Sequence, residues 1–316
     1  MLNLLKKIGT GKYLYRFWYQ PISTIKNWKR QGFKSTFSTW RSRRDMRIAA
    51  SQLECPATEP APFLTPVCYL TGAKYWEQTA FCLYSLQKNL NLQIRAIIVD
   101  DGTLTGEHIA TLMKVAPRSR IVPESESKRR IDEQLDKSAF PTLHLLWHEY
   151  KHIRKLIDPH LLGEKAVLVL DSDMLFRRPP LELLEWLESP SGSLVMCDCT
   201  ESYGYTKEQL YTACGNTVPS LVNVGVTGLV TSDINWSRLE DWSSRLIGAY
   251  GRSYFLEQAL VAMQISNFDY LILPTDTYAV LPDNESASYR NNELVLGHYV
   301  ADSKRFYFCE AWRSQV

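Results

Sequence analysis

Two carboxylates one residue apart, Asp171 and Asp173, directly follow an apolar run at residues 166–170. That run predicts a buried strand of a parallel sheet, and ligands of open α/β sheets bind outside the carboxyl ends of such strands. Side chains at i and i+2 of an extended segment share one face, so the two ionised aspartates would repel each other without a cation. Carboxylate oxygens favour Mg²⁺, Ca²⁺ or Mn²⁺, which also hold phosphate groups. The pair therefore indicates a metal site for a phosphate-bearing ligand, with two solvated aspartates at a turn as the alternative.

Other polar residues stand where strands are expected to end or to be interrupted. Asp100 follows the strand expected at 94–99 and could bond a ribose hydroxyl or a base edge, with an Asp-Gly turn as the alternative. Asn223 and Gly225 interrupt the run 222–226, where a glycine weakens a strand unless another group must approach its backbone. His298, far along the chain, could complete the aspartate site, although an isolated histidine is more often structural.

The elements that must position these residues alternate between strand and helix. From residue 66 onward this alternation predicts an α/β fold, with a mostly parallel sheet and helices on both faces. We expect strands at 67–70, 94–99, 166–170, 194–196 and 222–226, and helices at 76–89, 138–156, 181–187 and 254–264.

The chain of 316 residues is long enough for one α/β domain with an appendage. Residues 1–50 hold twelve Lys or Arg against one acid, Asp45, whereas the remainder holds 24 basic and 33 acidic residues. Pro56, Pro60, Pro62 and Pro66 predict an extended linker. We therefore expect an N-terminal arm and linker at 1–60 and a catalytic domain at 61–316.

The N-terminal arm interleaves its basic residues with nine aromatic residues between Tyr13 and Trp40. Such a mixture is typical of segments at an anionic bilayer surface. A helical arm packed on its own domain or on a partner subunit has the same composition, as does a segment that binds nucleic acid through base stacking. The first interpretation is preferred and nucleic acid is the least favoured.

Composition excludes several classes of protein. The seven cysteines contain no C-x-x-C pair, and Cys197-x-Cys199 reads as two core or edge residues, so we expect reduced thiols. No apolar run approaches 18 residues, and residues 1–19 lack the uninterrupted apolar region of a secretory signal. These features predict a cytoplasmic protein, peripheral at the inner face of a membrane if the arm binds there.

Taken in order, four motifs resemble the retaining glycosyltransferases of family eight, the group of glycogenin and the bacterial lipooligosaccharide galactosyltransferases, which have the GT-A fold. The resemblance covers roughly residues 66–308 and leaves the arm outside it. The motifs are Leu170-Asp171-Ser172-Asp173, Asn223-Val224-Gly225, Glu257-Gln258 and His298-x-x-Ala301-x-x-Lys304.

The resemblance implies a role for each motif. Asp171, Asp173 and His298 would hold Mn²⁺ on the diphosphate of a UDP-sugar, and Lys304 would contact that diphosphate. The donor sugar and the acceptor would lie against Asn223, Gly225, Glu257 and Gln258, of which Asn223, Glu257 and Gln258 are the candidate catalytic residues. Further candidates for binding the donor are Thr71, Asp100, Ser172 and Arg154, the last by similarity to an arginine on the helix before the D-x-D strand.

The chain departs from the family at two positions. Ala301 replaces the glycine between His298 and Lys304, and Ala259 occupies the place of a further aspartate after the acid-Gln pair. Front-face attack by the acceptor is therefore preferred over a covalent intermediate, with Glu257 as the fallback carboxylate. The run 99–103 also resembles the V-D-D-G-S turn of the inverting family two transferases, which leaves an inverting transferase as one alternative. A non-catalytic nucleotide-sugar binding module is another.

Overall fold

The computed structural model describes residues 33–60, 64–290 and 294–316, and the chain forms two compact units, Met1–Ile48 and Ala49–Val316. Helix α4 (Phe33–Gln52) begins in the first unit and ends in the second. The first 32 residues of the arm and Pro62 of the linker lie outside the described residues. A catalytic domain that starts at residue 61 stays a prediction.

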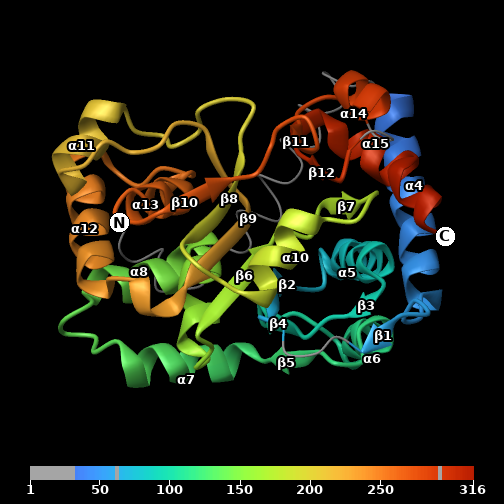
Figure 1. Cartoon of the computed structure of the whole chain (residues 1–316), viewed down its shortest axis with the longest axis horizontal. Coiled ribbons are helices and arrows are strands. Elements are labelled where there is room, and N and C mark those ends of the chain that lie inside the picture. The colour runs from blue at the N-terminus through green and yellow to red at the C-terminus, as the bar shows by residue number, and fades with distance from the viewer. Residues whose placement is uncertain (1–32, 61–63, 291–293) are drawn as a thin grey trace, which may run out of the picture. The chain divides into compact units, whose positions relative to one another are not determined.

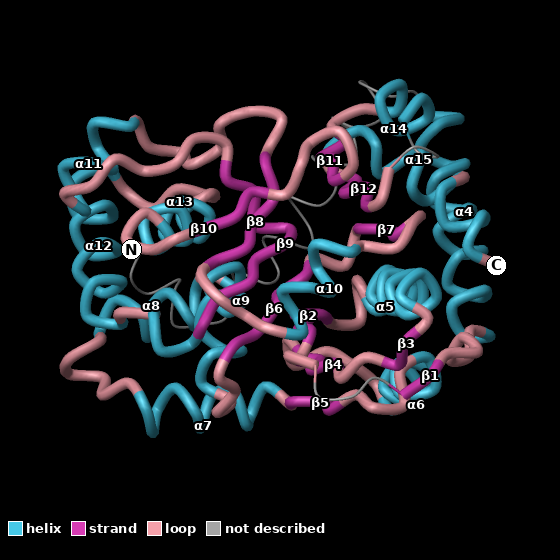
Figure 2. The backbone as a smooth tube through the Cα atoms, viewed as in Figure 1, coloured by secondary structure: helices cyan, strands magenta, loops and turns pink. Residues whose placement is uncertain are grey.

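A seven-stranded sheet with the order β10-β8-β9-β6-β2-β4-β5 crosses the middle of the second unit (Figures 1 and 2). Six strands run in one direction, because every pair outside β9 is parallel, whereas β9 is antiparallel to both of its neighbours. The mostly parallel α/β sheet expected from the sequence is therefore confirmed. The strands are β2 (Val67–Thr71), β4 (Ala96–Asp100), β5 (Arg120–Val122), β6 (Ala166–Leu170), β8 (Ser193–Cys197), β9 (Val222–Val230) and β10 (Tyr270–Ile272).

Helices cover both faces of this sheet (Figure 2). On one face, apolar residues of α7 (Glu124–Gln134) and of five further helices form a core cluster with β8 and β9. On the other face, the Tyr69 hydroxyl of β2 meets Cys82 of α5, and the Trp186 ring of α10 lies against Gly228 of β9. The first set is α8 (Pro141–Glu149), α9 (Arg154–Ile157), α11 (Lys207–Cys214), α12 (Trp236–Tyr250) and α13 (Leu256–Ile265); the second includes α5 (Trp76–Leu90) and α10 (Leu181–Glu188).

A small three-stranded sheet extends the unit beyond the D-x-D segment. Its strand β7 (Met174–Phe176) follows Asp173 directly and pairs antiparallel with β12 (Leu296–Tyr299), which pairs parallel with β11 (Tyr278–Leu281). Helix α15 (Lys304–Cys309) comes after β12, and α14 (Asn284–Arg290) precedes it. This sheet is what carries the distant C-terminal motif back to the aspartates.

Part of the proline-rich linker packs as an edge of the second unit. Strand β1 (Glu59–Pro60) pairs with β3 (Leu92–Gln93), and the Cys55 backbone N–H donates to the Lys114 carbonyl at 3.1 Å. Lys114 lies on α6 (Gly106–Val115), and it also pairs with Glu54. Backbone pairing thus fixes the described end of the linker against the sheet domain.

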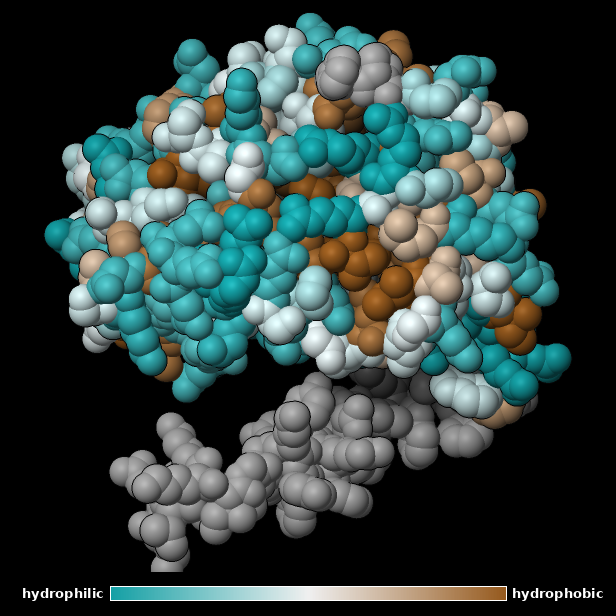
Figure 3. All heavy atoms as spheres, turned by 90° about the horizontal axis from the view of Figure 1, so that it is seen from below, coloured by the Kyte–Doolittle hydropathy of each residue, from teal (hydrophilic) through white to brown (hydrophobic). Residues whose placement is uncertain are grey.

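Helix α7 (Glu124–Gln134) carries charged side chains on a solvent face. Three ion pairs at i, i+4 spacing follow this helix: Lys128 with Asp132, Arg129 with Glu133, and Arg130 with Glu126. The face of the molecule seen from below, where α7 lies, is mostly hydrophilic, with a smaller exposed hydrophobic area (Figure 3). Exposed pairs of this kind contribute little to stability, so α7 is held mainly by its buried Ile131.

The single helix expected at 138–156 is wrong. Pro141 starts α8 at its first turn, and the backbone leaves the helix at Tyr150 with φ −135° and ψ 86° before α9 begins. Tyr150 is held outside the helix because its hydroxyl donates to the Tyr254 carbonyl at 2.6 Å and accepts from the Glu257 backbone N–H at 3.2 Å. The break separates α8 from the short helix that carries Arg154 and Lys155.

Candidate functional site

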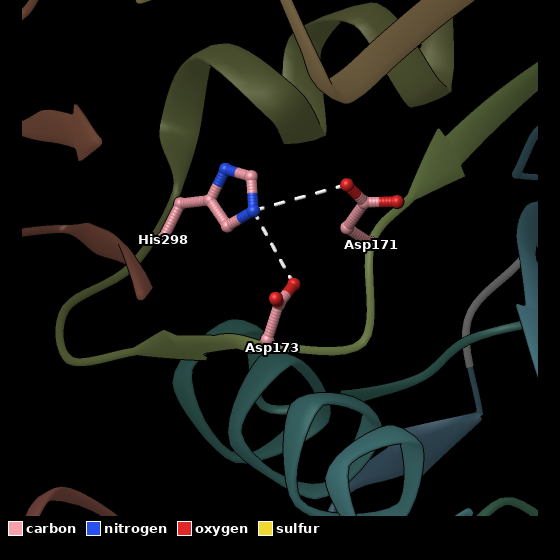
Figure 4. Close-up of side chains that lie close together, drawn as sticks. All are labelled: Asp171, Asp173 and His298. Atoms are coloured by element: carbon pink, nitrogen blue, oxygen red, sulfur yellow. Dashed lines mark ion pairs between the residues drawn. The ribbon is translucent and has the colours of Figure 1, made fainter. Parts of the chain in front are cut away.

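Asp171, Asp173 and His298 converge at the carboxyl end of β6 (Figure 4). His298 Nε2 lies 3.8 Å from Asp171 Oδ2 and 3.3 Å from Asp173 Oδ1. One donor atom from each residue falls within 4.8 Å of the others, a spacing that suits a single divalent cation. Two carboxylates and an imidazole form a hard, mixed O/N donor set, so the three residues fit the metal site expected from the D-x-D spacing.

The sheet topology explains why motifs distant in sequence meet here. Because β9 runs antiparallel to β6 and β8, its first residues lie at the carboxyl ends of both neighbours, with Val226 opposite Leu170 and Val222 opposite Cys197. In the small sheet, His298 pairs with Met174, one residue after Asp173. The Tyr299 N–H donates to the Asp173 carbonyl at 2.9 Å and fixes that register.

Gly225 provides the space into which the His298 ring packs. A Cβ atom at position 225 would lie 2.5 Å from His298 Nδ1 and 2.8 Å from Asn223 Oδ1. Asn223 Oδ1 accepts from the Gly225 N–H at 2.8 Å, and the Gly225 carbonyl accepts from the Asp171 N–H at 2.8 Å. The group predicted to approach this glycine is therefore the imidazole of the metal site.

Lys304 and His298 set the charge on Asp173. Lys304 Nζ, on the first residue of α15, donates to Asp173 Oδ2. Burial alone would raise the pKa of Asp173, but its contacts with Lys304 and His298 outweigh burial and hold this pKa well below its usual range. Asp173 is thus ionised at neutral pH, as a metal ligand must be.

Lys155, which the sequence analysis did not single out, links Asp171 to Glu257. Its buried ammonium lies 2.9 Å from Asp171 Oδ1 and 3.5 Å from Glu257 Oε2. Burial alone would lower the pKa of Lys155, but the two carboxylates outweigh it and raise that pKa. For the carboxyl group of Glu257, burial acts in the other direction and raises the pKa to about 7, although Lys155 opposes this shift. The pair places a carboxyl group with a near-neutral pKa, on the first turn of α13, beside the metal ligands.

Asp198 is a second residue that the sequence analysis missed. Its Oδ2 accepts from Asn223 Nδ2 at 3.0 Å and from Gln258 Nε2 at 3.1 Å, so one carboxylate orients both amides of the expected sugar pocket. A signal was present, because Asp198 stands just after the apolar run of β8, as Asp171 stands just after β6.

Asp100 and Thr71 end adjacent strands, and their side chains are engaged in local structure. Asp100 Oδ1 accepts from the backbone N–H groups of residues 102, 103 and 104 at 2.9, 3.0 and 3.1 Å, as in a tight Asp-Gly turn. The Thr71 hydroxyl accepts from Thr79 Oγ1 at 2.8 Å, and the Thr71 carbonyl holds the Asp101 N–H at 2.8 Å. Both residues therefore shape the loop at the sheet edge, and contact with a nucleotide stays a prediction.

Arg154 does not point at the D-x-D carboxylates. Its guanidinium, 1% exposed, donates to Asp158 at 2.8 Å, to Glu124 at 3.0 Å and to the Asp100 carbonyl at 3.2 Å, and lies over the Trp147 ring. The neighbouring Lys155 makes the contact with Asp171 instead. Ser172 lies between the two aspartates and is half-buried.

Comparisons with solved structures place the fold among glycosyltransferases. The chain superposes on the apo structure of the bifunctional glycosyltransferase WbbM with a TM-score of 0.54 at 11% identity, over 80% of this chain and 50% of that one. It superposes on apo mouse xyloside xylosyltransferase 1 with a TM-score of 0.52 at 13% identity, over 75% of this chain and 98% of that one. Its superposition on the galactosyltransferase LgtC has a TM-score of 0.49 at 11% identity, over 80% of this chain and 100% of that one.

The chain thus spans about half the length of WbbM and nearly the whole xylosyltransferase. At this level of identity the comparisons show the fold alone, and they bear out the expected GT-A type architecture. No family model matches the sequence, and no curated protein matches it significantly. Among the described residues, every helix is too short or too polar to cross a bilayer.

Proposed function

We propose that this protein is a metal-dependent glycosyltransferase that moves a hexose from a UDP-sugar to a hydroxyl acceptor with retention of configuration. The observation that carries the proposal is the convergence of Asp171, Asp173 and His298 at the carboxyl end of β6, within a fold shared with glycosyltransferases. A divalent cation bound to these residues, with Mn²⁺ the expected ion, would act as a Lewis acid toward a diphosphate leaving group.

Lys304 is placed to assist departure of the nucleotide. Its ammonium contacts Asp173, and its side chain is 35% exposed, so it can reach a phosphate oxygen next to the metal ligands. A fixed positive charge at the position where negative charge develops lowers the barrier without reorganisation. In this proposal Lys304 is the protein's own contribution to leaving-group stabilisation.

Asn223 and Gln258 would orient the sugar. Both amide nitrogens are tied to Asp198, so neither side chain is free to rotate, and both lie on elements that also carry site residues. Glu257, held by Lys155, completes the carboxylates at this edge of the sheet. A rigid polar pocket of this kind aligns the anomeric carbon with an incoming hydroxyl, which is where much of the rate enhancement of transfer reactions originates.

Retention by front-face attack is preferred because Ala259 occupies the position of the family's further aspartate. The two carboxylates near the pocket each have a partner of their own: Asp198 accepts two amide N–H groups, and Glu257 pairs with Lys155. These contacts favour positioning roles over nucleophilic attack. For the acceptor we propose the hydroxyl of a glycan, of a lipid-linked molecule or of a protein.

The test is hydrolysis of a panel of UDP-sugars with and without Mn²⁺, since glycosyltransferases slowly transfer sugar to water. We expect UDP release from one donor in the presence of Mn²⁺, and a loss of at least 100-fold in Asp173→Ala, because removal of one metal ligand weakens both binding and charge stabilisation. Asp241→Ala is the matched control, because Asp241 is an exposed aspartate of α12 that pairs with Arg245.

Anomeric analysis of the product by NMR then distinguishes retention from inversion. An inverted product would overturn the retaining mechanism and leave the transferase activity standing. Silence across the panel, with no Mn²⁺-linked UDP binding by calorimetry, would overturn the proposal and favour a non-catalytic binding module.

A further inference from the structure

Helix α4 presents one continuous exposed stripe of aromatic, aliphatic and basic side chains. Six residues, at positions 37, 40, 41, 44, 47 and 48, are exposed, whereas those between them are at least half-buried. At 100° per residue the six positions cover about 120° of the helix circumference. The spacing of three and four residues is what places them on one face. The residues are Phe37, Trp40, Arg41, Arg44, Arg47 and Ile48.

The apolar members of this stripe are large and open to solvent. Phe37 is 58% exposed, Trp40 62% and Ile48 51%. The Phe37 and Trp40 rings stack with centroids 6.1 Å apart, so they form one continuous apolar group. Rings of this type gain free energy by leaving water when an apolar phase is within reach.

The basic members of the stripe give it one sign of charge. Arg41, Arg44 and Arg47 flank the rings, and Asp45 is the one acid among residues 1–50, against twelve Lys or Arg. The rest of the chain has the opposite balance, with 33 acidic residues against 24 basic ones. The stripe therefore complements an anionic surface.

We propose that this stripe of α4 binds the anionic headgroup surface of a membrane, with Phe37, Trp40 and Ile48 entering the headgroup region and the three arginines contacting lipid phosphates. A bilayer satisfies both halves of the stripe at once, because apolar side chains enter the acyl boundary while guanidinium groups stay at the phosphates. A nucleic acid offers phosphates and base faces, but it gives no favourable environment to an aliphatic side chain such as Ile48. This inference is independent of the transferase chemistry.

The expected loss of vesicle affinity follows from the number of arginines that are removed. Each arginine near an anionic surface contributes about fivefold in affinity, equivalent to about 1 kcal/mol. Arg41→Gln with Arg44→Gln should therefore weaken binding to anionic vesicles by about 25-fold. At high salt, where the electrostatic attraction to the vesicles is screened, the double variant Phe37→Ser with Trp40→Ser should weaken vesicle binding more than the arginine double variant does.

The experiment is sedimentation of the full chain with vesicles of phosphatidylcholine alone and with vesicles that contain about one third phosphatidylglycerol, an anionic lipid. We expect binding to the anionic vesicles that falls with salt and is weaker in both double variants. Tyr211→Ser is the matched control, because Tyr211 is 57% exposed on α11, outside the arm. Asp173→Ala should bind vesicles as the unchanged chain does, which separates this test from the test of catalysis.

The emission of Trp40 gives a second readout. Vesicle binding should shift part of the tryptophan fluorescence to the blue, and Trp40→Phe should remove much of that shift while binding persists. Equal binding of the unchanged chain and both double variants would overturn the proposal. So would tight, salt-dependent binding of single-stranded DNA without vesicle binding, or a self-association that the double variants abolish.

Discussion

At the scale of single residues, the candidate metal site depends on a glycine, Gly225, because this residue has no side chain. Glycine is the only residue type that fits at position 225 of β9, because any Cβ there would overlap His298 Nδ1. His298 Nδ1 is buried without a hydrogen-bond partner among the described residues. In most metal sites the second ring nitrogen of a histidine ligand donates a hydrogen bond that orients the ring, and here packing against Gly225 takes that place. The glycine is thus a determinant of imidazole orientation.

We predict that Gly225→Ala lowers Mn²⁺ affinity by about 10–100-fold, the range seen when the support of a metal ligand is lost. The added methyl group must push the His298 ring away from Asp171 and Asp173 or displace β9. Calorimetric titration with Mn²⁺ alone measures the effect. Gly248→Ala is the control, since a Cβ there meets no described atom within 4 Å on helix α12. Unchanged Mn²⁺ affinity in Gly225→Ala would contradict this role of the glycine.

At the scale of elements, the turn between β12 and α15 decides how Lys304 reaches Asp173. Ala301 lies in this turn with φ 48°, in the left-handed region that glycine adopts without steric cost. The family that the chain resembles has a glycine at this position, and this chain places an alanine in a conformation that favours glycine. Strain at a residue beside a functional site persists only if its surroundings enforce it.

We predict that Ala301→Gly raises the free energy of unfolding by about 0.5–1 kcal/mol. Relief of the left-handed alanine is worth about 1–2 kcal/mol, and the greater freedom of glycine in the unfolded chain offsets about half of it. Urea denaturation measures the change. Ala110→Gly, at an exposed position of helix α6, should have the opposite sign and cost about 1 kcal/mol. Destabilisation by Ala301→Gly would show that Ala301 is not strained.

The same elements show what the sequence could predict. The strand 166–170 and the helix at 76–89 were foreseen almost to the residue, because a buried apolar run and a 3.6-residue period are local signals. The break at Tyr150 was not, since it depends on hydrogen bonds to residues 254 and 257, about a hundred positions away. Lys155 was missed for the same reason: only the fold shows that it, and not Arg154, faces Asp171.

At the scale of the whole molecule, acid stability depends on groups buried in one protonation state. His160 is 4% exposed beneath β6, its Nδ1 lies 3.1 Å from Thr231 Oγ1, and its Nε2 has no hydrogen-bond partner among the described residues. Burial lowers the pKa of His160 to about 3. The folded protein therefore keeps this imidazole neutral at pH values where the unfolded chain already binds a proton.

We predict that His160 makes stability fall as the pH drops from about 6.5, the usual histidine pKa, toward 3. The folded pKa is the lower one, so the contribution is fully present above the unfolded pKa and is lost on acidification, by up to about 1.4 kcal/mol per pH unit. Urea denaturation between pH 7 and pH 4, for the unchanged chain and for His160→Gln, isolates this slope, because other titrating groups contribute equally to both. His148→Gln removes an exposed imidazole of α8 and controls for the loss of one histidine. Parallel stability curves for the unchanged chain and His160→Gln would mean that His160 takes up its proton in the folded state, and that water reaches Nε2.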